Sequence, residues 1–201
     1  MSTGRRLGLF GGAFDPPHSA HVALARAALA QLQLDELRVL PTGSAWHKAR
    51  ALSASGHRLA MTRLAFADMP GVVVDDRELR RDGPTYTVDT LRELQREHPQ
   101  DTLVLVIGAD QADTFDQWRE SAEIGRLAII CVAVRPRADA PAGAVDPSRL
   151  PGQQWVPITL PPLPVSATDI RTRRASGLGI DHLVPPAVAR YIDQHHLYLP
   201  A

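Results

Sequence analysis

The segment that decides the fold is Gly11-Gly12-Ala13-Phe14-Asp15-Pro16-Pro17-His18-Ser19-Ala20-His21. An apolar run at residues 6–10 precedes it, and an apolar stripe with helical spacing follows at Val22, Ala25, Leu29 and Leu32. This order predicts a strand, a tight turn and an amphipathic helix, which is how an open α/β sheet begins. The two glycines permit a sharp turn and let a ligand approach the backbone.

The turn also has the features of an anion site. Its prolines fix the chain just before the helix, whose unpaired N–H groups and positive dipole end favour an anion such as phosphate. His18 and His21 are three residues apart, so both can point at the same ligand. Two other interpretations stay open here: a structural turn with two surface histidines, and a weak metal site made by Asp15, His18 and His21.

Apolar runs and helical patterns alternate along the rest of the chain. Strands are predicted at residues 37–40, 72–74, 103–107, 127–134 and 154–160, and helices at 56–67 and 88–97. Such alternation favours parallel strands joined by helices, so we expect one α/β domain over residues 1–201, a doubly wound, Rossmann-like parallel sheet with helices on both faces. Two short helices, at 168–175 and 186–195, predict a small helical part at the carboxyl end, and residues 135–151 predict an exposed loop.

The composition argues against several classes of function. Lys plus Arg and Asp plus Glu both number 22, so no general field attracts nucleic acid or an anionic membrane. No apolar run reaches the roughly 20 residues that span a bilayer, and residues 1–9 lack a secretory signal, which predicts a cytoplasmic protein. The single cysteine, Cys131, lies in an apolar run, so we expect a buried thiol and no disulfide.

Two common nucleotide-binding fingerprints are absent from the sequence. A dinucleotide-binding dehydrogenase would show Gly-x-Gly-x-x-Gly and an acid at the end of the second strand, where Val39-Leu40-Pro41 stands. A P-loop would show Gly-x-x-x-x-Gly-Lys followed by Ser or Thr, and no such string occurs. Both classes are therefore disfavoured.

Residues 11–21 resemble the Gly-Gly-x-Phe-Asp-Pro-x-His-x-x-His motif of the nucleotidyltransferase superfamily that is related to class I aminoacyl-tRNA synthetases. Val165-Ser166-Ala167-Thr168-Asp169-Ile170-Arg171 resembles its second motif, although Ser166 and Thr168 also suit a plain helix cap. Members transfer AMP or CMP from a nucleoside triphosphate. The resemblance implies that ATP contacts Gly11, Gly12, Ala13, Phe14, His18, His21, Gly108, Asp110, Ser166, Thr168 and Arg171.

Three further segments, at residues 83–91, 108–118 and 185–198, are similar to bacterial nicotinate mononucleotide adenylyltransferases. In that family the first segment meets the pyridine carboxylate through its backbone, and a tryptophan in the second stacks on the pyridine ring. The resemblance implies that nicotinate mononucleotide contacts Asp15, Lys48, Thr85, Tyr86, Thr87 and Trp118. Structural interpretations remain: the threonines also suit helix caps, and Trp118 also suits a core position.

The resemblance implies that ATP and nicotinate mononucleotide react to give nicotinate adenine dinucleotide and pyrophosphate, a step of NAD biosynthesis. His18, His21, Lys48 and Arg171 are the expected catalytic residues, which supply positive charge and donors to the phosphates. Mg²⁺ is expected as a cofactor held mainly by the phosphates of ATP, with no metal site on the protein. Because a phosphate monoester is itself the nucleophile, no catalytic triad is needed.

The sequence departs from the family pattern at three positions. Ala13 stands where Ser or Thr is frequent, Ala20 stands where Gly is usual, and Trp46 precedes His47-Lys48 where proline is common. Alternatives are an adenylyltransferase for nicotinamide mononucleotide or phosphopantetheine, although the latter usually has Thr at the position of His18, and a nucleotide-binding sensor without turnover. The preference between the acid and the amide mononucleotide stays open, as does the oligomeric state.

Overall fold

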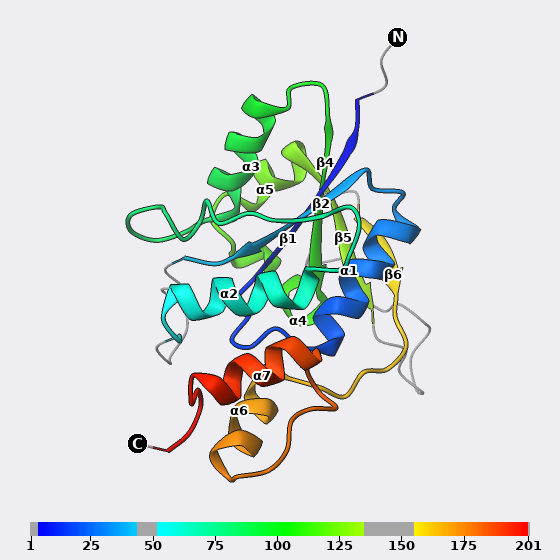
Figure 1. Ribbon diagram of the computed structural model, residues 1–201. Coiled ribbons are helices and arrows are strands. Elements are labelled where there is room, and N and C mark those ends of the chain that lie inside the picture. Colours follow the sequence, from blue (N-terminus) through cyan, green and yellow to red (C-terminus); the bar gives the residue numbers. More distant parts are fainter. Residues whose placement is uncertain (1–3, 44–51, 135–154, 201) are drawn as a thin grey trace.

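The computed structural model of the chain describes residues 4–43, 52–134 and 155–200. Six parallel strands form one sheet in the order β3-β2-β1-β4-β5-β6 (Figure 1). The strands are β1 (Arg6–Gly12), β2 (Glu36–Pro41), β3 (Val72–Val74), β4 (Thr102–Gly108), β5 (Ala128–Val134) and β6 (Trp155–Thr159). The order reverses between β1 and β4, and the crevice at such a point, outside the carboxyl ends of the strands, is where open α/β sheets bind ligands.

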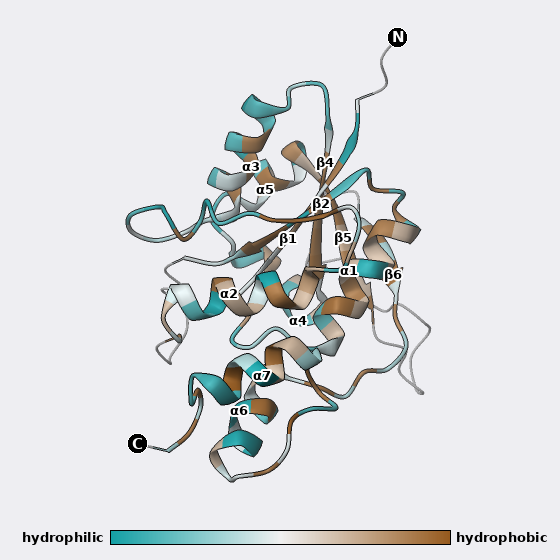
Figure 2. Ribbon diagram, viewed as in Figure 1, coloured by the Kyte–Doolittle hydropathy of each residue, from teal (hydrophilic) through white to brown (hydrophobic). Residues whose placement is uncertain are grey.

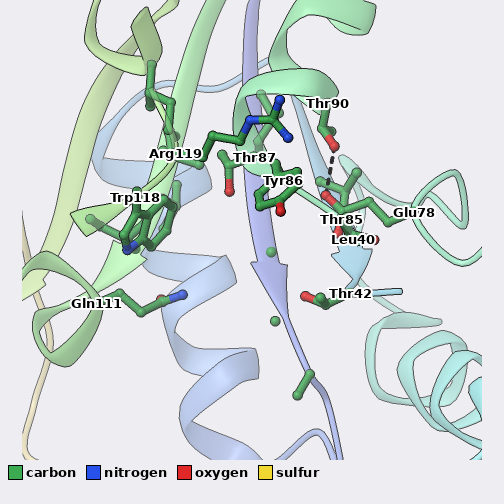
Figure 3. A pocket seen from close by; sticks show the side chains of 18 of the residues that line it. Leu40, Thr42, Glu78, Thr85, Tyr86, Thr87, Thr90, Gln111, Trp118 and Arg119 are labelled. Carbon is green, nitrogen blue, oxygen red and sulfur yellow. Dashed lines mark hydrogen bonds between the residues drawn. The ribbon is translucent and has the colours of Figure 1, made fainter. Parts of the chain in front are cut away.

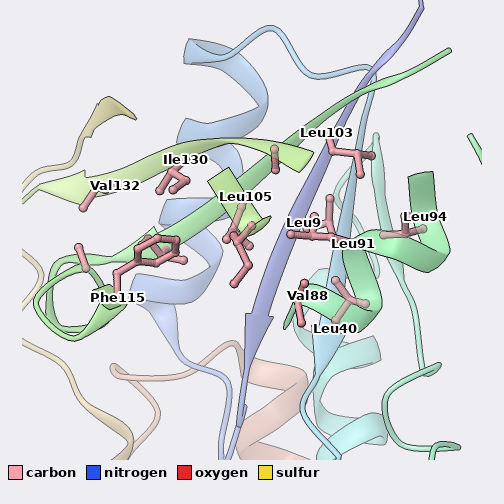
Figure 4. Packing of buried hydrophobic residues seen from close by; sticks show 14 of the residues in the cluster. Leu9, Leu40, Val88, Leu91, Leu94, Leu103, Leu105, Phe115, Ile130 and Val132 are labelled. Carbon is pink, nitrogen blue, oxygen red and sulfur yellow. The ribbon is translucent and has the colours of Figure 1, made fainter. Parts of the chain in front are cut away.

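Helices cover both faces of the sheet because strand side chains alternate between the faces. On one face, Leu9 and its neighbours pack with α3 (Thr87–Glu97) and α5 (Ser121–Leu127), as Figure 4 shows. On the other face, Phe10 packs with α1 (Ser19–Gln31) and with Phe66 of α2 (Ser55–Phe66). The strands are mostly apolar over their whole length, as expected of a parallel sheet covered on both sides (Figure 2).

The carboxyl-terminal part forms a separate apolar cluster that packs on α2. Ile170 of α6 (Ala167–Ala175) and Val188 and Ile192 of α7 (Pro186–Gln194) are fully buried together with Met61 of α2. Figure 1 shows α6 and α7 side by side below the sheet. In the described part of the chain, no helix is long and apolar enough to span a membrane.

The predicted doubly wound sheet and the small helical part are confirmed, and most predicted elements lie within two residues of the observed ones. Cys131 is a free, buried thiol on β5, also as predicted. The predicted helical stripe is confirmed, because Ala25 and Leu32 are buried in the core and Val22 and Leu29 are partly buried against the same cluster. The cluster also includes Leu24 and Ala28 of α1. Three short elements were not predicted: α4 (Ala109–Ala112), η1 (Phe115–Gln117) and α5. The predicted loop at residues 135–151 lies outside the described residues.

Candidate active site

The two glycines lie at the end of β1, where they keep space open. A Cβ atom at Gly11 would meet no described atom within 4 Å, whereas one at Gly12 would stand 3.0 Å from the ring of Phe14. Gly11 therefore leaves its space to a ligand, and Gly12 allows the Phe14 ring to pack closely. The predicted sharp turn does not occur at these glycines, since β1 continues through Gly12.

The chain turns instead at Phe14, whose φ of 47° is in the left-handed region that few non-glycine residues adopt. Its buried ring fixes the turn through edge contacts at centroid distances of 5.5 Å to Phe10, 5.0 Å to His21 and 6.2 Å to Phe66. A cis peptide bond follows between Asp15 and Pro16. The contacts of the Phe14 ring with these three aromatic rings therefore hold the turn at the end of β1 in place.

His18 and His21 lie together at the start of α1. Their rings stack with centroids 3.7 Å apart, and Nδ1 of His21 accepts a hydrogen bond of 3.1 Å from the backbone N–H of His18. Because Nδ1 of His21 is an acceptor, the neutral ring carries its proton on Nε2. The two histidine rings therefore lie together beside the N-terminus of α1.

The second motif meets the first in space, 156 residues further along the chain. Ser166 caps α6, its Oγ accepting a hydrogen bond of 3.1 Å from the N–H of Asp169. One turn later, Arg171 donates a hydrogen bond of 2.8 Å to the carbonyl of Asp15 and another of 3.0 Å to Oγ1 of Thr168. The guanidinium of Arg171 thus lies against the turn that the first motif forms.

A buried polar network that the sequence did not reveal supports this turn. Asp15 is 2% exposed, and its carboxylate accepts hydrogen bonds from the Tyr198 hydroxyl at 2.7 Å and from the Ser53 N–H at 3.1 Å. Burial, and after it the charge of Asp15, raises the pKa of Tyr198, so this hydroxyl keeps its proton and donates. The network ties the carboxyl-terminal segment to the turn after β1.

Arg58 of α2 completes the network. It is 3% exposed and donates to the carbonyls of Ala13 at 3.0 Å, Thr42 at 2.8 Å and Ser53 at 3.1 Å. Burial lowers the pKa of Arg58, while the charge of Asp15 opposes this effect. An arginine remains charged under such conditions, so it is a permanent link between the ends of β1 and β2.

A cavity of about 480 Å³ opens beside the Gly11 backbone, on the α3 side of the sheet. Figure 3 shows Trp118 forming one wall and Tyr86 and Thr87, at the start of α3, lying opposite. The half-buried Trp118 ring also packs on the Phe115 ring, with the ring centroids 5.4 Å apart. Trp118 therefore both contributes to the core and lines the cavity. Thr85 and Asp110, which the sequence singled out, line the same cavity.

Glu78, also missed in the sequence, lines the cavity although it is 7% exposed. Its carboxyl accepts a hydrogen bond of 2.8 Å from Thr90, drawn in Figure 3. Burial raises the pKa of Glu78 to about 7, against the opposing effects of Thr90 and Arg81. The wall of the cavity therefore carries a carboxyl group that is largely neutral below neutral pH.

We expect Glu78→Gln to stabilise the protein at pH 8 and to have little effect at pH 4. The folded-state pKa of about 7 lies above the ordinary value of 4.5, so ionisation costs stability as the pH rises through this interval. The difference between these two pKa values corresponds to about 3 kcal/mol in the free energy of unfolding. Urea unfolding at several pH values measures it.

Glu97→Gln is the matched control, because hydrogen bonding to Arg77 lowers the pKa of Glu97. That substitution should reduce stability at neutral pH and lose its effect in acid. A Glu78→Gln variant whose stability tracks the unsubstituted protein at every pH would show that the carboxyl ionises freely.

The predicted site residues fall into two groups around Gly11 and Gly12. Gly11, Gly12, Ala13, Asp110 and the residues from Thr85 to Thr87, with Trp118, line the cavity. Phe14, His18, His21, Ser166, Thr168 and Arg171 surround the turn and the starts of α1 and α6. Gly108 lies at the end of β4, and its N–H donates to Gln111 Oε1 at 3.0 Å.

Four predictions need comment. Lys48 lies outside the described residues. Asp15 is not among the residues that line the cavity, because its carboxylate is directed at Tyr198 and Ser53. The alternative of a metal site at Asp15, His18 and His21 is not supported, since the described residues contain no group of three or more metal-ligating side chains suitably placed. Thr85 and Thr87 do not cap α3, whose capping position is Tyr86.

Paired histidines at a helix start, beside an aromatic cavity at the point where the strand order reverses, indicate a nucleotide-binding enzyme. The model of the cytidylyltransferase-like family matches residues 9–173. A "probable nicotinate-nucleotide adenylyltransferase" of Albidiferax ferrireducens is 54% identical, with 98% of this chain and all of the relative covered. One of Methylibium petroleiphilum is 41% identical, with 98% and 93% covered. The chain belongs to the nicotinate-nucleotide adenylyltransferases of the cytidylyltransferase-like nucleotidyltransferase family.

Solved structures share the fold. The chain superimposes on the Plasmodium falciparum nicotinic acid mononucleotide adenylyltransferase, solved in complex with NaAD, with a TM-score of 0.77 and 21% identity over 96% of this chain and 97% of that one. The crystal structure of a "putative nicotinate-nucleotide adenylyltransferase" from Vibrio parahaemolyticus gives a TM-score of 0.72 and 19% identity over 98% of this chain and 97% of that one. The architecture is therefore kept where the sequences have diverged widely.

Proposed function

We propose that the protein joins the AMP of ATP to nicotinate mononucleotide, producing nicotinate adenine dinucleotide and pyrophosphate for NAD biosynthesis. The observation that carries the proposal is the position of the Gly11 backbone. It lines the aromatic cavity, and the chain that follows it leads directly to the stacked pair of His18 and His21. A mononucleotide in the cavity and a triphosphate at the helix start would therefore meet at one backbone turn.

The two substrates are assigned to the two groups of residues. The pyridine ring lies on the indole of Trp118, because an aromatic face suits a flat ring, and its substituent reaches the start of α3 at Thr85, Tyr86 and Thr87. ATP uses the second group, with its phosphates against Phe14, the paired histidines, Ser166, Thr168 and Arg171. It also contacts residues 11–13 where the two groups meet, Gly108 at the end of β4 and Asp110 on α4. Lys48 is proposed as a further phosphate ligand.

The reaction is an in-line displacement at the α-phosphorus of ATP. A phosphate oxygen of the mononucleotide forms the new bond to this phosphorus, and the bond to the bridging oxygen of the leaving pyrophosphate breaks. The nucleophile needs no general base, because the second pKa of a phosphate monoester is about 6 and the group is largely dianionic at neutral pH. The protein aligns two anions and offers donors to the charge that develops on the leaving group.

Asp15 has a different role in this proposal from the one expected at first. Its carboxylate holds Tyr198 and Ser53, and its carbonyl holds Arg171, so it positions the turn rather than contacting the mononucleotide. The guanidinium of Arg171 is thereby held near the start of α1.

Nucleotidyltransferases generally use a divalent metal ion with ATP, and we propose Mg²⁺ here. The side chains at the start of α1 and α6 are imidazoles and a guanidinium, which suit phosphate oxygens but not a hard cation that prefers oxygen ligands. Mg²⁺ would therefore arrive with the phosphates of ATP and neutralise part of their charge, while the protein supplies no cage for it.

Pyrophosphate release tests the proposal. The purified protein with ATP and Mg²⁺ should release pyrophosphate when nicotinate mononucleotide is added, and the same amount of dinucleotide should form. Parallel reactions with nicotinamide mononucleotide and with phosphopantetheine test the alternatives within the superfamily. If none of these three acceptors causes the release of pyrophosphate, the result would favour a nucleotide-binding protein without turnover.

Trp118→Ala should raise the KM for nicotinate mononucleotide about tenfold, the scale of a lost ring stacking contact, and leave the KM for ATP nearly unchanged. Initial rates at varied concentrations of each substrate measure both constants. Trp118→Phe, which keeps an aromatic face, is the matched control and should have a smaller effect. An unchanged mononucleotide KM in the alanine variant would assign Trp118 to packing alone.

A further inference from the structure

We propose that Arg119 selects the acid over the amide at the pyridine ring, an inference that rests on the proposed function. Among the described residues that line the cavity, Arg119 is the only one with a positively charged side chain. It follows Trp118 in the sequence, so a ring lying on the indole brings any acid group into the field of this guanidinium. A nicotinate carboxylate gains from that field, and a neutral carboxamide does not.

The guanidinium is held in place by an aromatic ring. Its central carbon lies 4.5 Å from the centroid of the Tyr86 ring, a cation–π contact that fixes it over the start of α3. Figure 3 shows the Arg119 side chain reaching across the upper part of the cavity from the Trp118 side toward Tyr86 and Thr87. The positive charge and the N-terminal end of α3 thus act on the same part of the cavity, and both favour an anion there.

The acidic neighbour of Arg119 has a stronger partner. Glu120 accepts two hydrogen bonds from Arg92, at 3.3 and 2.5 Å, whereas its nearest contact with Arg119 is 3.7 Å. The negative charge of Glu120 is therefore balanced mainly by Arg92. The positive charge of Arg119 therefore remains available to the cavity, because the guanidinium is stacked on Tyr86, which also lines it.

The two acids of the cavity wall do not cancel this preference. Glu78 lies on the far side in Figure 3, next to Thr85 and hydrogen-bonded to Thr90. Asp110 lines the cavity from α4, which packs on β4 and β5. Arg119 is the charged group beside the indole, and the side chain is 54% exposed, so its field is screened by water and salt. The expected selectivity is accordingly moderate.

The test compares kcat/KM for nicotinate and nicotinamide mononucleotides in Arg119→Met. We expect the acid-to-amide ratio to fall about two- to fivefold, the range for one partly exposed charge, with most of the change in the KM for the acid. Arg119→Lys should keep part of the preference for the acid, since lysine retains the positive charge but cannot stack a planar group on Tyr86. Raising the salt concentration should lower the ratio for the unsubstituted protein and not for Arg119→Met.

Arg126→Met is the matched control, because Arg126 lies on α5, pairs with Glu123 and does not line the cavity. It should leave the ratio unchanged. If Arg119→Met also leaves the ratio unchanged, the inference is wrong and the backbone of α3 selects the acid. If the unsubstituted protein uses neither mononucleotide, it is the proposed function that fails, so the two failures are distinguishable.

Discussion

His21→Ala is expected to lower kcat by about 100-fold or more, the typical loss when one preorganised donor to a developing oxyanion is removed. Nδ1 of His21 accepts the N–H of His18, so the donor of the neutral ring is Nε2–H, which we assign to a phosphate oxygen. The donor acts on charge that builds up as pyrophosphate leaves, and the KM for ATP should therefore change less than kcat. Steady-state rates with saturating mononucleotide measure both constants.

His21→Asn separates catalysis from support of the turn. The asparagine oxygen can still accept the His18 N–H, but the side chain has no group at the position of Nε2, so turnover should remain low. His18→Ala should also lower kcat strongly, and the exposed His182→Ala should not. Normal turnover in both His18→Ala and His21→Ala, with intact folding by circular dichroism, would show that the histidine pair does not contribute to catalysis.

Arg58→Met is expected to destabilise the protein by about 3–5 kcal/mol, the cost of removing one partner from a buried charged network. The substitution leaves the carbonyls of Ala13, Thr42 and Ser53 without their donor and the buried charge of Asp15 without its counterpart. Because the same network holds the turn after β1, kcat should fall as well. Urea unfolding and initial rates measure the two effects.

Two variants calibrate that result. Arg63→Met lies on the same helix, but Arg63 is 58% exposed and pairs with Asp76 at 3.5 Å, so its loss should cost less than about 1 kcal/mol. Tyr198→Phe removes one hydrogen bond to Asp15 and should cost about 1–3 kcal/mol. An Arg58→Met variant no less stable than Arg63→Met would show that the buried network contributes nothing to the fold.

The fold could be predicted largely because each main element has a clear apolar pattern. β3 (Val72–Val74) was predicted to the residue, since three consecutive valines stand between the turn residues Pro70-Gly71 and the acids Asp75-Asp76. The α4, η1 and α5 elements were missed because segments of four, three and seven residues are too short to show a helical period.

The site could be predicted where its residues fall in contiguous motifs, and not where it depends on contacts between distant segments. The turn after β1 and the start of α6 carry recognisable patterns. Arg58 gives no such signal, because an arginine in a helical pattern is usually solvated. The contact between Asp15 and Tyr198 joins residues 183 positions apart. The cytoplasmic location and the role of Lys48 stay predictions.

The fate of labelled phosphate tests the transfer itself most directly. The protein is incubated with nicotinate mononucleotide, Mg²⁺ and ATP carrying a radioactive label on either the α- or the γ-phosphate, and the products are separated. Attack of the mononucleotide phosphate on the α-phosphorus predicts that the α-label enters the dinucleotide and the γ-label leaves in pyrophosphate, in equal amounts. An α-label that remains in ADP, with the γ-label on the acceptor or in orthophosphate, would contradict adenylyl transfer.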